Sequence, residues 1–277
     1  MEWLAIIISG LFTAITPAGL ILDTVIANSL RAQVVDVDQL AVRIDNTPSY
    51  QALKGKIARV RIATRGIEPI IGLRVAELEL ESDPLDIDID RLKAGGEISN
   101  PQSLLDQPLQ VAIRLLITEE DINQALSSPA IKERLQNLLD SAIPQSSGAS
   151  LFAFKIMKIE VDFLASDRSR IYVKLQPKVT DENPQTTSET DPIEVELESG
   201  FRVLGGRSLQ ILEPEGKLNG RRLSTKLLQG FAEGLSEDQL DLRQLQKQGI
   251  TLRILQFEMN DNSMEIAIFL RIEPESD

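Results

Sequence analysis

The sequence predicts an α+β fold that is predominantly antiparallel β with three main helices. Apolar residues alternate with polar ones over most of the chain, which is the period of strands with one buried face. Helical spacing replaces this alternation in three places, near 18–33, 118–140 and 220–235. The 277 residues are 42% hydrophobic and 26% charged, as in folded globular proteins, and only 4% aromatic, so we expect an aliphatic core.

The N-terminus carries an uncharged run from Trp3 to Leu22. Twenty helical residues at about 1.5 Å each would just span a bilayer core of about 30 Å. Pro17 and Gly19 interrupt this run, and no Lys or Arg precedes it, which argues against a secretory signal. A span and a cleaved signal stay open, but the pattern favours a helix that is buried or lies on a membrane.

The next helix is expected to be amphipathic, with Pro17 near its start. Leu22, Val25 and Ile26 share one face, and we expect this face to lie against the concave, apolar side of a sheet. We therefore divide the chain into a hydrophobic segment over 1–16 and a single domain over 17–277.

The alternation predicts a series of strands with one apolar and one charged face. These strands are expected at 35–44, 57–64, 73–80, 85–90, 109–117, 152–164, 170–179, 193–203, 208–212, 250–259 and 263–272.

Two connections have local signals. Thr118-Glu119-Glu120-Asp121 has the form of a capping box with Asp in place of the usual Glu or Gln, which predicts that a helix begins there and that Pro129 restarts it. The polar stretch over 180–192 is predicted to be a mobile loop.

The composition argues against most catalytic and nucleic-acid-binding chemistry. Histidine and cysteine are both absent, so Ser-His and Cys-His catalytic pairs cannot form. The spacing of Asp86, Asp88 and Asp90 suggests a calcium loop, but Arg91 stands where such a loop needs glycine. A net charge of −13 disfavours nucleic acid as a partner. We expect no catalytic residue, metal or cofactor, and leave carboxylate-based catalysis as a minor alternative.

A basic stretch that contains Arg59, Arg61 and Arg65 allows two interpretations. The arginines could contact anionic lipid headgroups, where each charge contributes roughly 1 kcal/mol. Alternatively, they could pair across neighbouring strands with Glu77, Glu79 and Glu81. The second interpretation is favoured, although the first stays a candidate headgroup site.

Several short segments resemble one bacterial family. The stretch over 16–34, the basic strand after Gly55, the phrase Thr118-Glu119-Glu120-Asp121-Ile122-Asn123-Gln124-Ala125-Leu126 and the closing Gly249-Ile250-Thr251-Leu252-Arg253-Ile254-Leu255 resemble the LmeA-like phospholipid-binding family, which is common in cyanobacteria. The resemblance covers most of the chain. It implies a fold similar to the tubular lipid-binding superfamily, in which a curved antiparallel sheet wraps a long helix and lipid tails lie between them.

The residue pattern supports the same function independently, since an apolar helix beside strands with an apolar face would form a dry trough for acyl chains. We expect non-enzymatic binding of phospholipid or a related lipid by a membrane-associated protein, peripheral or N-terminally anchored. The alternative is a scaffold that binds a protein partner through the same groove. The candidate groove residues are Leu22, Val25, Ile26, Val60, Ile62, Val111, Ile113 and Leu115.

Overall fold

The computed structural model describes residues 22–46, 51, 54–88, 101–142, 153–178, 191–226, 228–230, 232 and 242–275. Its described strands form a six-stranded sheet in the order β1-β3-β4-β6-β13-β12 and a five-stranded sheet in the order β11-β10-β9-β8-β7, called the first and second sheets below. Every strand pairing within them is antiparallel, which confirms the expected α+β class at this level. The uncharged run before Leu22 and most of the predicted loop over 180–192 lie outside the described residues.

The first sheet follows the predicted alternation closely. It consists of β1 (Asp36–Asp45), β3 (Arg59–Ile70), β4 (Leu73–Ser82), β6 (Leu109–Thr118), β12 (Ile250–Met259) and β13 (Ser263–Ile272), with β2 (Lys56–Ile57) and β5 (Leu85–Asp86) paired beside it. The strand predicted at 85–90 is shorter than expected. After Asp86, Ile87 bridges Leu105, and Asp88 donates its amide to Leu104 of the 3-10 helix η2 (Pro101–Leu104).

The second sheet is built from the strands predicted in the second half of the chain. They are β7 (Ala153–Leu164), β8 (Arg168–Lys178), β9 (Ile193–Leu204), β10 (Ser208–Leu218) and β11 (Arg221–Arg222). β10 extends beyond the predicted end at Leu212 because the register shifts between Leu212 and Glu215, which interrupts the alternation in the sequence.

The described helices are short. α2 (Leu22–Gln33), α4 (Glu119–Ser127) and α5 (Pro129–Ala142) contain 12, 9 and 14 residues, and residues 225–226, 228–230 and 232 are also helical. The capping box at Thr118 is confirmed, with Asp121 supplying the reciprocal side-chain bond. A long helix wrapped by a sheet, which the family resemblance implied, is not seen in the described part of the chain.

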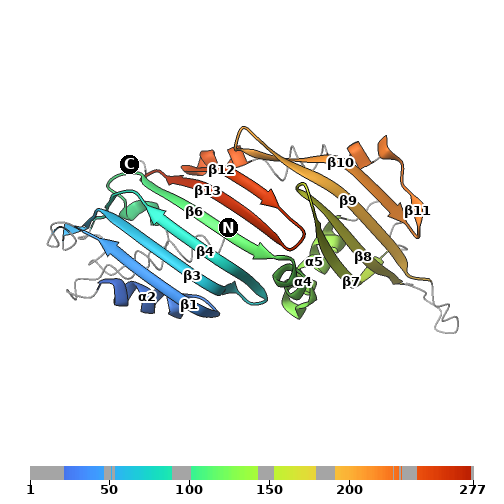
Figure 1. Ribbon diagram of the computed structural model, residues 1–277, viewed down its shortest axis with the longest axis horizontal. Helices are drawn as coiled ribbons and strands as arrows, with labels where there is room; N and C mark the ends of the chain where they lie inside the picture. Colours follow the sequence, from blue (N-terminus) through green and yellow to red (C-terminus); the bar gives the residue numbers. More distant parts are fainter. Residues whose placement is uncertain are drawn as a thin grey trace.

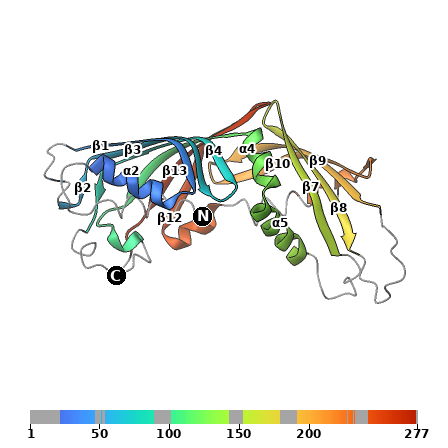
Figure 2. The ribbon, with the colours of Figure 1, turned by 90° about the horizontal axis from the view of Figure 1, so that it is seen from below.

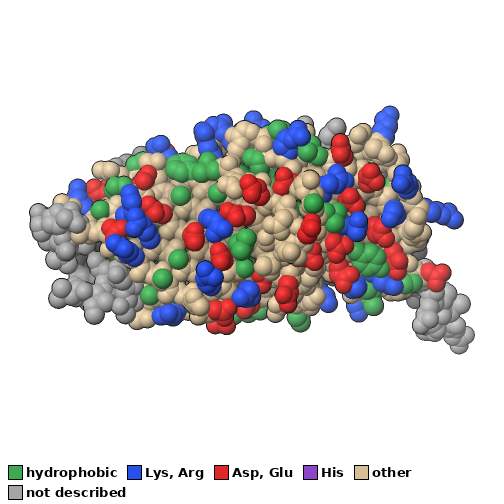
Figure 3. Space-filling model, in the orientation of Figure 1, with side chains coloured by type: hydrophobic (Ala, Val, Ile, Leu, Met, Phe, Trp, Pro, Cys, Tyr) green, Lys and Arg blue, Asp and Glu red, His purple; other side chains and the backbone are tan. Residues whose placement is uncertain are grey.

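The two sheets lie end to end and together form an arch (Figures 1 and 2). α2, α4 and α5 lie on its concave side (Figure 2), while the convex side carries interspersed basic and acidic side chains over both sheets (Figure 3). The second sheet contacts the edge strand β12 of the first sheet through a turn and through β9. Ile254 donates its amide to Gly206 at 2.8 Å, and the rings of Phe201 and Phe257 pack edge to face at 6.3 Å.

Hydrophobic burial differs strongly between the sheets. The described core cluster lies on the concave face of the first sheet, where Leu30 of α2 packs with residues of β3, β4, β6 and β13. Val60 and Leu109 are 0% exposed in this cluster. The first sheet therefore has a filled core of its own, and the single domain expected over 17–277 stays a prediction.

Candidate functional site

The predicted groove residues on the strands lie together, on the concave face of the first sheet. Val60 and Ile62 of β3 and Val111, Ile113 and Leu115 of β6 are at most 5% exposed and belong to the core cluster. A cavity of about 10 Å³ lies beside them under α2, lined by residues that include Leu30, Ile62 and Thr64. This cavity is far smaller than an acyl chain. A hollow of about 430 Å³ that Ile62 and Ile113 also line shares its lining with charged residues such as Arg61 and Glu79. The side chains of Leu22, Val25 and Ile26 are not among those described.

The predicted headgroup arginines lie on the opposite, convex face of the same sheet. Arg59 and Arg61 both contact Glu81, at 3.1 and 3.0 Å, and Arg65 contacts Glu77 at 3.3 Å. The cross-strand pairing that the sequence favoured is therefore present. Headgroup contact by these arginines stays a prediction, although each guanidinium already has a carboxylate partner.

The second sheet carries a continuous area of partly exposed apolar surface. Cross-strand partners such as Val173 and Val195, or Ile171 and Leu197, share one face and are each only partly buried. The opposite face carries the charged partners, for example Arg170 with Glu198. Because the charged face is convex (Figure 3), the apolar face is concave. This face comprises Ile156, Ile159, Val161, Ile171, Val173, Leu175, Ile193, Val195 and Leu197, none of which is fully buried.

The sequence analysis predicted these strands but assigned no groove residue to them. The period-two signal that could have found them is as clear here as in the first sheet. It shows which residues share a face, but it does not show whether a helix or a ligand covers that face.

One edge of this apolar face is closed by α4 and α5. Asn123 forms two hydrogen bonds with Val161, donating Nδ2–H to the carbonyl and accepting the amide N–H, both at 2.8 Å. Phe163 donates its amide to Glu119 Oε2 at 2.7 Å. Gln136 of α5 donates Nε2–H to the Phe154 carbonyl at 2.7 Å and accepts the Ile156 amide N–H at 2.9 Å. The two helices thus satisfy backbone groups along the free edge of β7, where another strand would otherwise pair.

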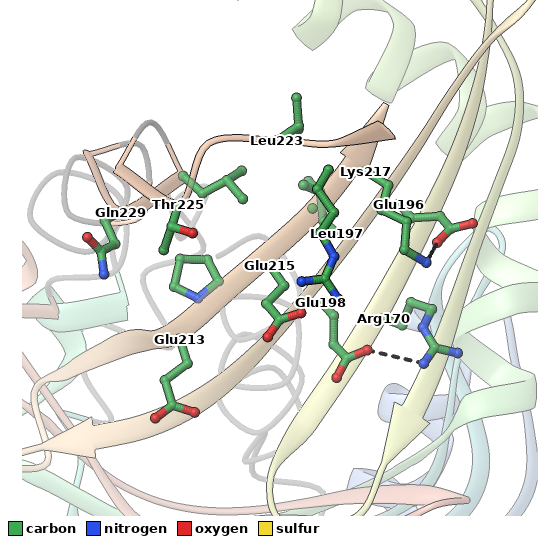
Figure 4. Close-up of a pocket in the computed structure, with 14 residues that line it drawn as sticks. Arg170, Glu196, Leu197, Glu198, Glu213, Glu215, Lys217, Leu223, Thr225 and Gln229 are labelled. Carbon is green, nitrogen blue, oxygen red and sulfur yellow. Dashed lines mark hydrogen bonds and ion pairs between the residues drawn. The ribbon is translucent and has the colours of Figure 1, made fainter. Parts of the chain in front are cut away.

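The other edge of the second sheet holds a cavity of about 540 Å³ (Figure 4). Its acids are partly neutralised by neighbouring cations: Glu198 contacts Arg170 at 3.1 Å, and Glu196 contacts Lys217 at 2.8 Å. Burial alone would raise the pKa of Glu198. The hydrogen bonds and positive charges of Arg170 and Arg168 together outweigh this effect, so the pKa lies below the ordinary value and the carboxylate stays charged. The lining residues are Arg170, Glu196, Leu197, Glu198, Glu213, Pro214, Glu215, Gly216, Lys217, Arg222, Leu223, Thr225, Leu228 and Gln229.

This cavity reaches the apolar face through Gly216. Gly216 lies opposite Leu197 in the sheet, and a side-chain carbon added at Gly216 would stand 3.0 Å from Leu197, 3.2 Å from Leu223 and 3.2 Å from Leu228. Glycine at this position therefore lets the segment after β11 pack closely against β10. The cavity and the apolar face are neighbours at the β10 edge.

The described residues show no grouping suited to metal chemistry. No three histidine, cysteine, aspartate or glutamate residues among them are placed to hold an ion. Asp86, part of the calcium-like spacing, instead contacts Lys56 at 3.1 Å, and Asp90 lies outside the described residues. Among the helices that the structure describes, none has both the length and the apolar character needed to cross a bilayer.

The model of a family described as LmeA-like phospholipid-binding matches residues 13–269, which is nearly the whole chain. No curated protein and no solved structure matched significantly.

Proposed function

Because the chain belongs to the LmeA-like phospholipid-binding family, we propose that it binds phospholipid acyl chains on the concave apolar face of the second sheet. The observation that carries this proposal is the contrast between the sheets. The middle strands of the first sheet place their apolar face in a cluster of 18 buried residues, with partly buried residues such as Leu40, Val42 and Ile268 packed against it. The nine apolar residues of the second-sheet face, by contrast, are all partly exposed. Covering them with an acyl chain would gain about 0.8 kcal/mol per buried methylene.

The surroundings of this face suit a lipid tail. α4 and α5 close its β7 edge, and the arch gives it a concave shape (Figure 2). Its nine side chains are aliphatic and carry no hydrogen-bonding groups, so they offer dispersion contacts without selecting a particular chain. Specificity for one headgroup would then depend on the polar residues at the edges of the sheet.

The proposal assigns binding, with no catalytic step. The family description names phospholipid binding, and the charged groups around the second-sheet cavity are largely held in ion pairs. We further propose that the protein acts at a membrane surface, where it would hold, sense or transfer lipid. The uncharged run from Trp3 would assist as an interfacial anchor, since indole prefers the headgroup level. Flotation of the full chain with liposomes, compared with a variant that lacks residues 1–15, tests the anchor.

The binding site is tested by native mass spectrometry of the purified protein and of two variants. Val195→Glu places a charge on the apolar face, and Leu204→Glu makes the same kind of change on the same strand, at a residue already 45% exposed. We expect lipid bound to the wild type and to Leu204→Glu, and loss of most lipid from folded Val195→Glu. Equal lipid content in both folded variants would place the lipid elsewhere. A lipid-free wild type that captures a protein partner through this face would favour the scaffold alternative.

A further inference from the structure

Exposed cations gather at the far end of the second sheet, although the protein is acidic overall. The segment over 216–232 contains Lys217, Arg221, Arg222 and Lys226 and no acid, in a chain whose net charge is −13. In Figure 3, blue side chains project from the end of the molecule where β11 lies in Figure 1. We propose that this end docks the protein on an anionic bilayer surface. The inference rests on the proposed function, because it names the membrane from which the second-sheet site would take or return lipid.

The pairing pattern separates these cations from the other basic residues nearby. Glu194 contacts Lys174 at 3.0 Å, Glu196 contacts Lys217 at 2.8 Å, and Glu198 contacts Arg168 and Arg170 at 3.2 and 3.1 Å. Arg221, Arg222 and Lys226 are exposed, and in the described chain no acid lies within 4.0 Å of their charged groups. They can therefore turn toward an external anion without breaking an ion pair among the residues that the structure describes.

Arg221 and Arg222 lie on the tight hairpin of β10 and β11, and Lys226 follows in the helical residues after it. Leu218 pairs with Arg221, so the turn consists of Asn219 and Gly220, whose φ values of 48° and 75° match the two-residue turn that Asn-Gly favours. Asn219 is fixed to β9, since Glu194 donates its amide to Asn219 Oδ1 at 2.7 Å and Asn219 donates its own to the Glu194 carbonyl at 2.8 Å. Leu218, 40% exposed at the tip, adds an apolar contact between the cations.

The position of this hairpin connects docking with lipid exchange. Leu223 and Leu228, which lie on either side of Lys226 in the chain, pack at Gly216 beside Leu197 of the apolar face. A bilayer seated on Arg221, Arg222 and Lys226 would therefore lie next to that end of the acyl-chain site. A headgroup phosphate there could also reach the cavity that Arg222 and Lys217 line.

The test measures binding of the full chain to vesicles in a co-sedimentation assay. Vesicles of equimolar phosphatidylglycerol and phosphatidylcholine are compared with phosphatidylcholine alone. The triple variant Arg221→Glu, Arg222→Glu, Lys226→Glu should bind the anionic vesicles about a hundredfold more weakly than the wild type. The control Arg134→Glu, Lys247→Glu, Arg253→Glu makes the same change of net charge at exposed residues elsewhere, and should bind like the wild type.

Two further variants should change vesicle binding in opposite directions. Glu215→Gln removes an acid from the cavity that Arg222 lines, and should strengthen binding to anionic vesicles. Leu218→Asn should weaken binding even at high salt, where the charge attraction is screened. Equal loss in both triple variants would overturn the proposal, because net charge alone would then explain it. Tighter binding of the wild type to a DNA duplex than to anionic vesicles would also overturn it.

Failure of this inference can be told apart from failure of the proposed function. Lipid content by native mass spectrometry reports the second-sheet site, and we expect it to be unchanged in the folded triple variant purified with its lipid. Wild-type vesicle binding that the triple variant retains, together with bound lipid, would overturn the docking surface alone. A wild type without lipid would overturn the proposed function, whatever the vesicle assay shows.

Discussion

Asn123 of α4 forms with Val161 of β7 both hydrogen bonds that a neighbouring strand would form, each 2.8 Å long. Glu119, four residues earlier, accepts the amide of Phe163, two residues later in β7. Four helical residues rise about 6 Å and two strand residues about 6.6 Å, so a helix can satisfy alternate backbone groups along an antiparallel strand edge. α4 thereby covers part of an edge that would otherwise be open to pairing with another chain.

Replacing Asn123 tests this edge cover. Asn123→Ala leaves the Val161 amide and carbonyl unpaired in a partly buried setting, so we expect the free energy of unfolding to fall by about 1–3 kcal/mol. Gln124→Ala is the control, since Gln124 is exposed on the same helix. Urea unfolding measures the stability, and hydrogen exchange should speed up at the Val161 amide in the first variant. Equal changes in both variants would mean that Asn123 contributes only helix propensity.

Arg74 connects the first sheet to the same helix. Its guanidinium lies 2.8 Å from Asp121, whose side chain is 4% exposed, and 3.0 Å from Asp38, whose side chain is 59% exposed. Arg74→Leu would leave the Asp121 carboxylate without its cation, and we expect a loss of about 1–3 kcal/mol in unfolding free energy because Arg74 itself is partly exposed. Asp38→Asn should cost less than 1 kcal/mol, as is usual for exposed pairs. A larger loss from Asp38→Asn, measured by thermal unfolding, would contradict this ranking.

Much of the strand structure could be predicted because the local pattern records it. Alternation located nearly every described strand, and Thr118 with Asp121 marked the start of α4 through a bond three residues apart. Alternation does not show which strands pair. β13 joins β6 through partners such as Ser263 and Thr118, which are far apart in the sequence, so the division into two sheets had no local signal.

The candidate site was harder to predict for a related reason. A strand face has the same pattern whether protein or ligand covers it, and so Ile113 and Val173 look alike in the sequence. In the structure Ile113 is 4% exposed in a filled core, whereas Val173 is partly exposed on the second sheet. Likewise, Arg61 and Arg221 look alike in the sequence, as basic surface residues. The structure distinguishes them, because Glu81 of the neighbouring strand β4 pairs with Arg61.

The Arg114–Glu265 pair should make stability depend on pH. Hydrogen bonds from Arg114, 2.8 and 3.1 Å long, lower the pKa of Glu265 below its ordinary value of 4.5. A depressed carboxylate pKa stabilises the folded state above pH 4.5, and this contribution is lost as pH falls through the folded value. Glu265→Gln should therefore lower the unfolding free energy at neutral pH and approach the wild type in acid.

Urea unfolding of the wild type and of Glu265→Gln, measured from neutral pH to below pH 4.5, gives the difference in unfolding free energy. Glu258→Gln is the control, because Glu258 lies directly opposite Glu265 on β12 and is exposed. It should change the unfolding free energy less than Glu265→Gln at neutral pH. A constant gap between Glu265→Gln and the wild type at every pH would show that the pair contributes packing alone.

The two apolar faces should respond in opposite ways to side-chain truncation. Ile113→Ala opens a cavity in the filled core of the first sheet, so we expect the unfolding free energy to fall by about 2–5 kcal/mol while lipid per folded molecule stays constant. Val173→Ala shortens one side chain of the partly exposed face of the second sheet. It should lower the unfolding free energy by about 1 kcal/mol or less, but weaken lipid retention. Thermal unfolding and native mass spectrometry of the same samples measure both quantities. Lipid loss from Ile113→Ala but not from Val173→Ala would return the acyl-chain site to the first sheet, where the sequence had placed it.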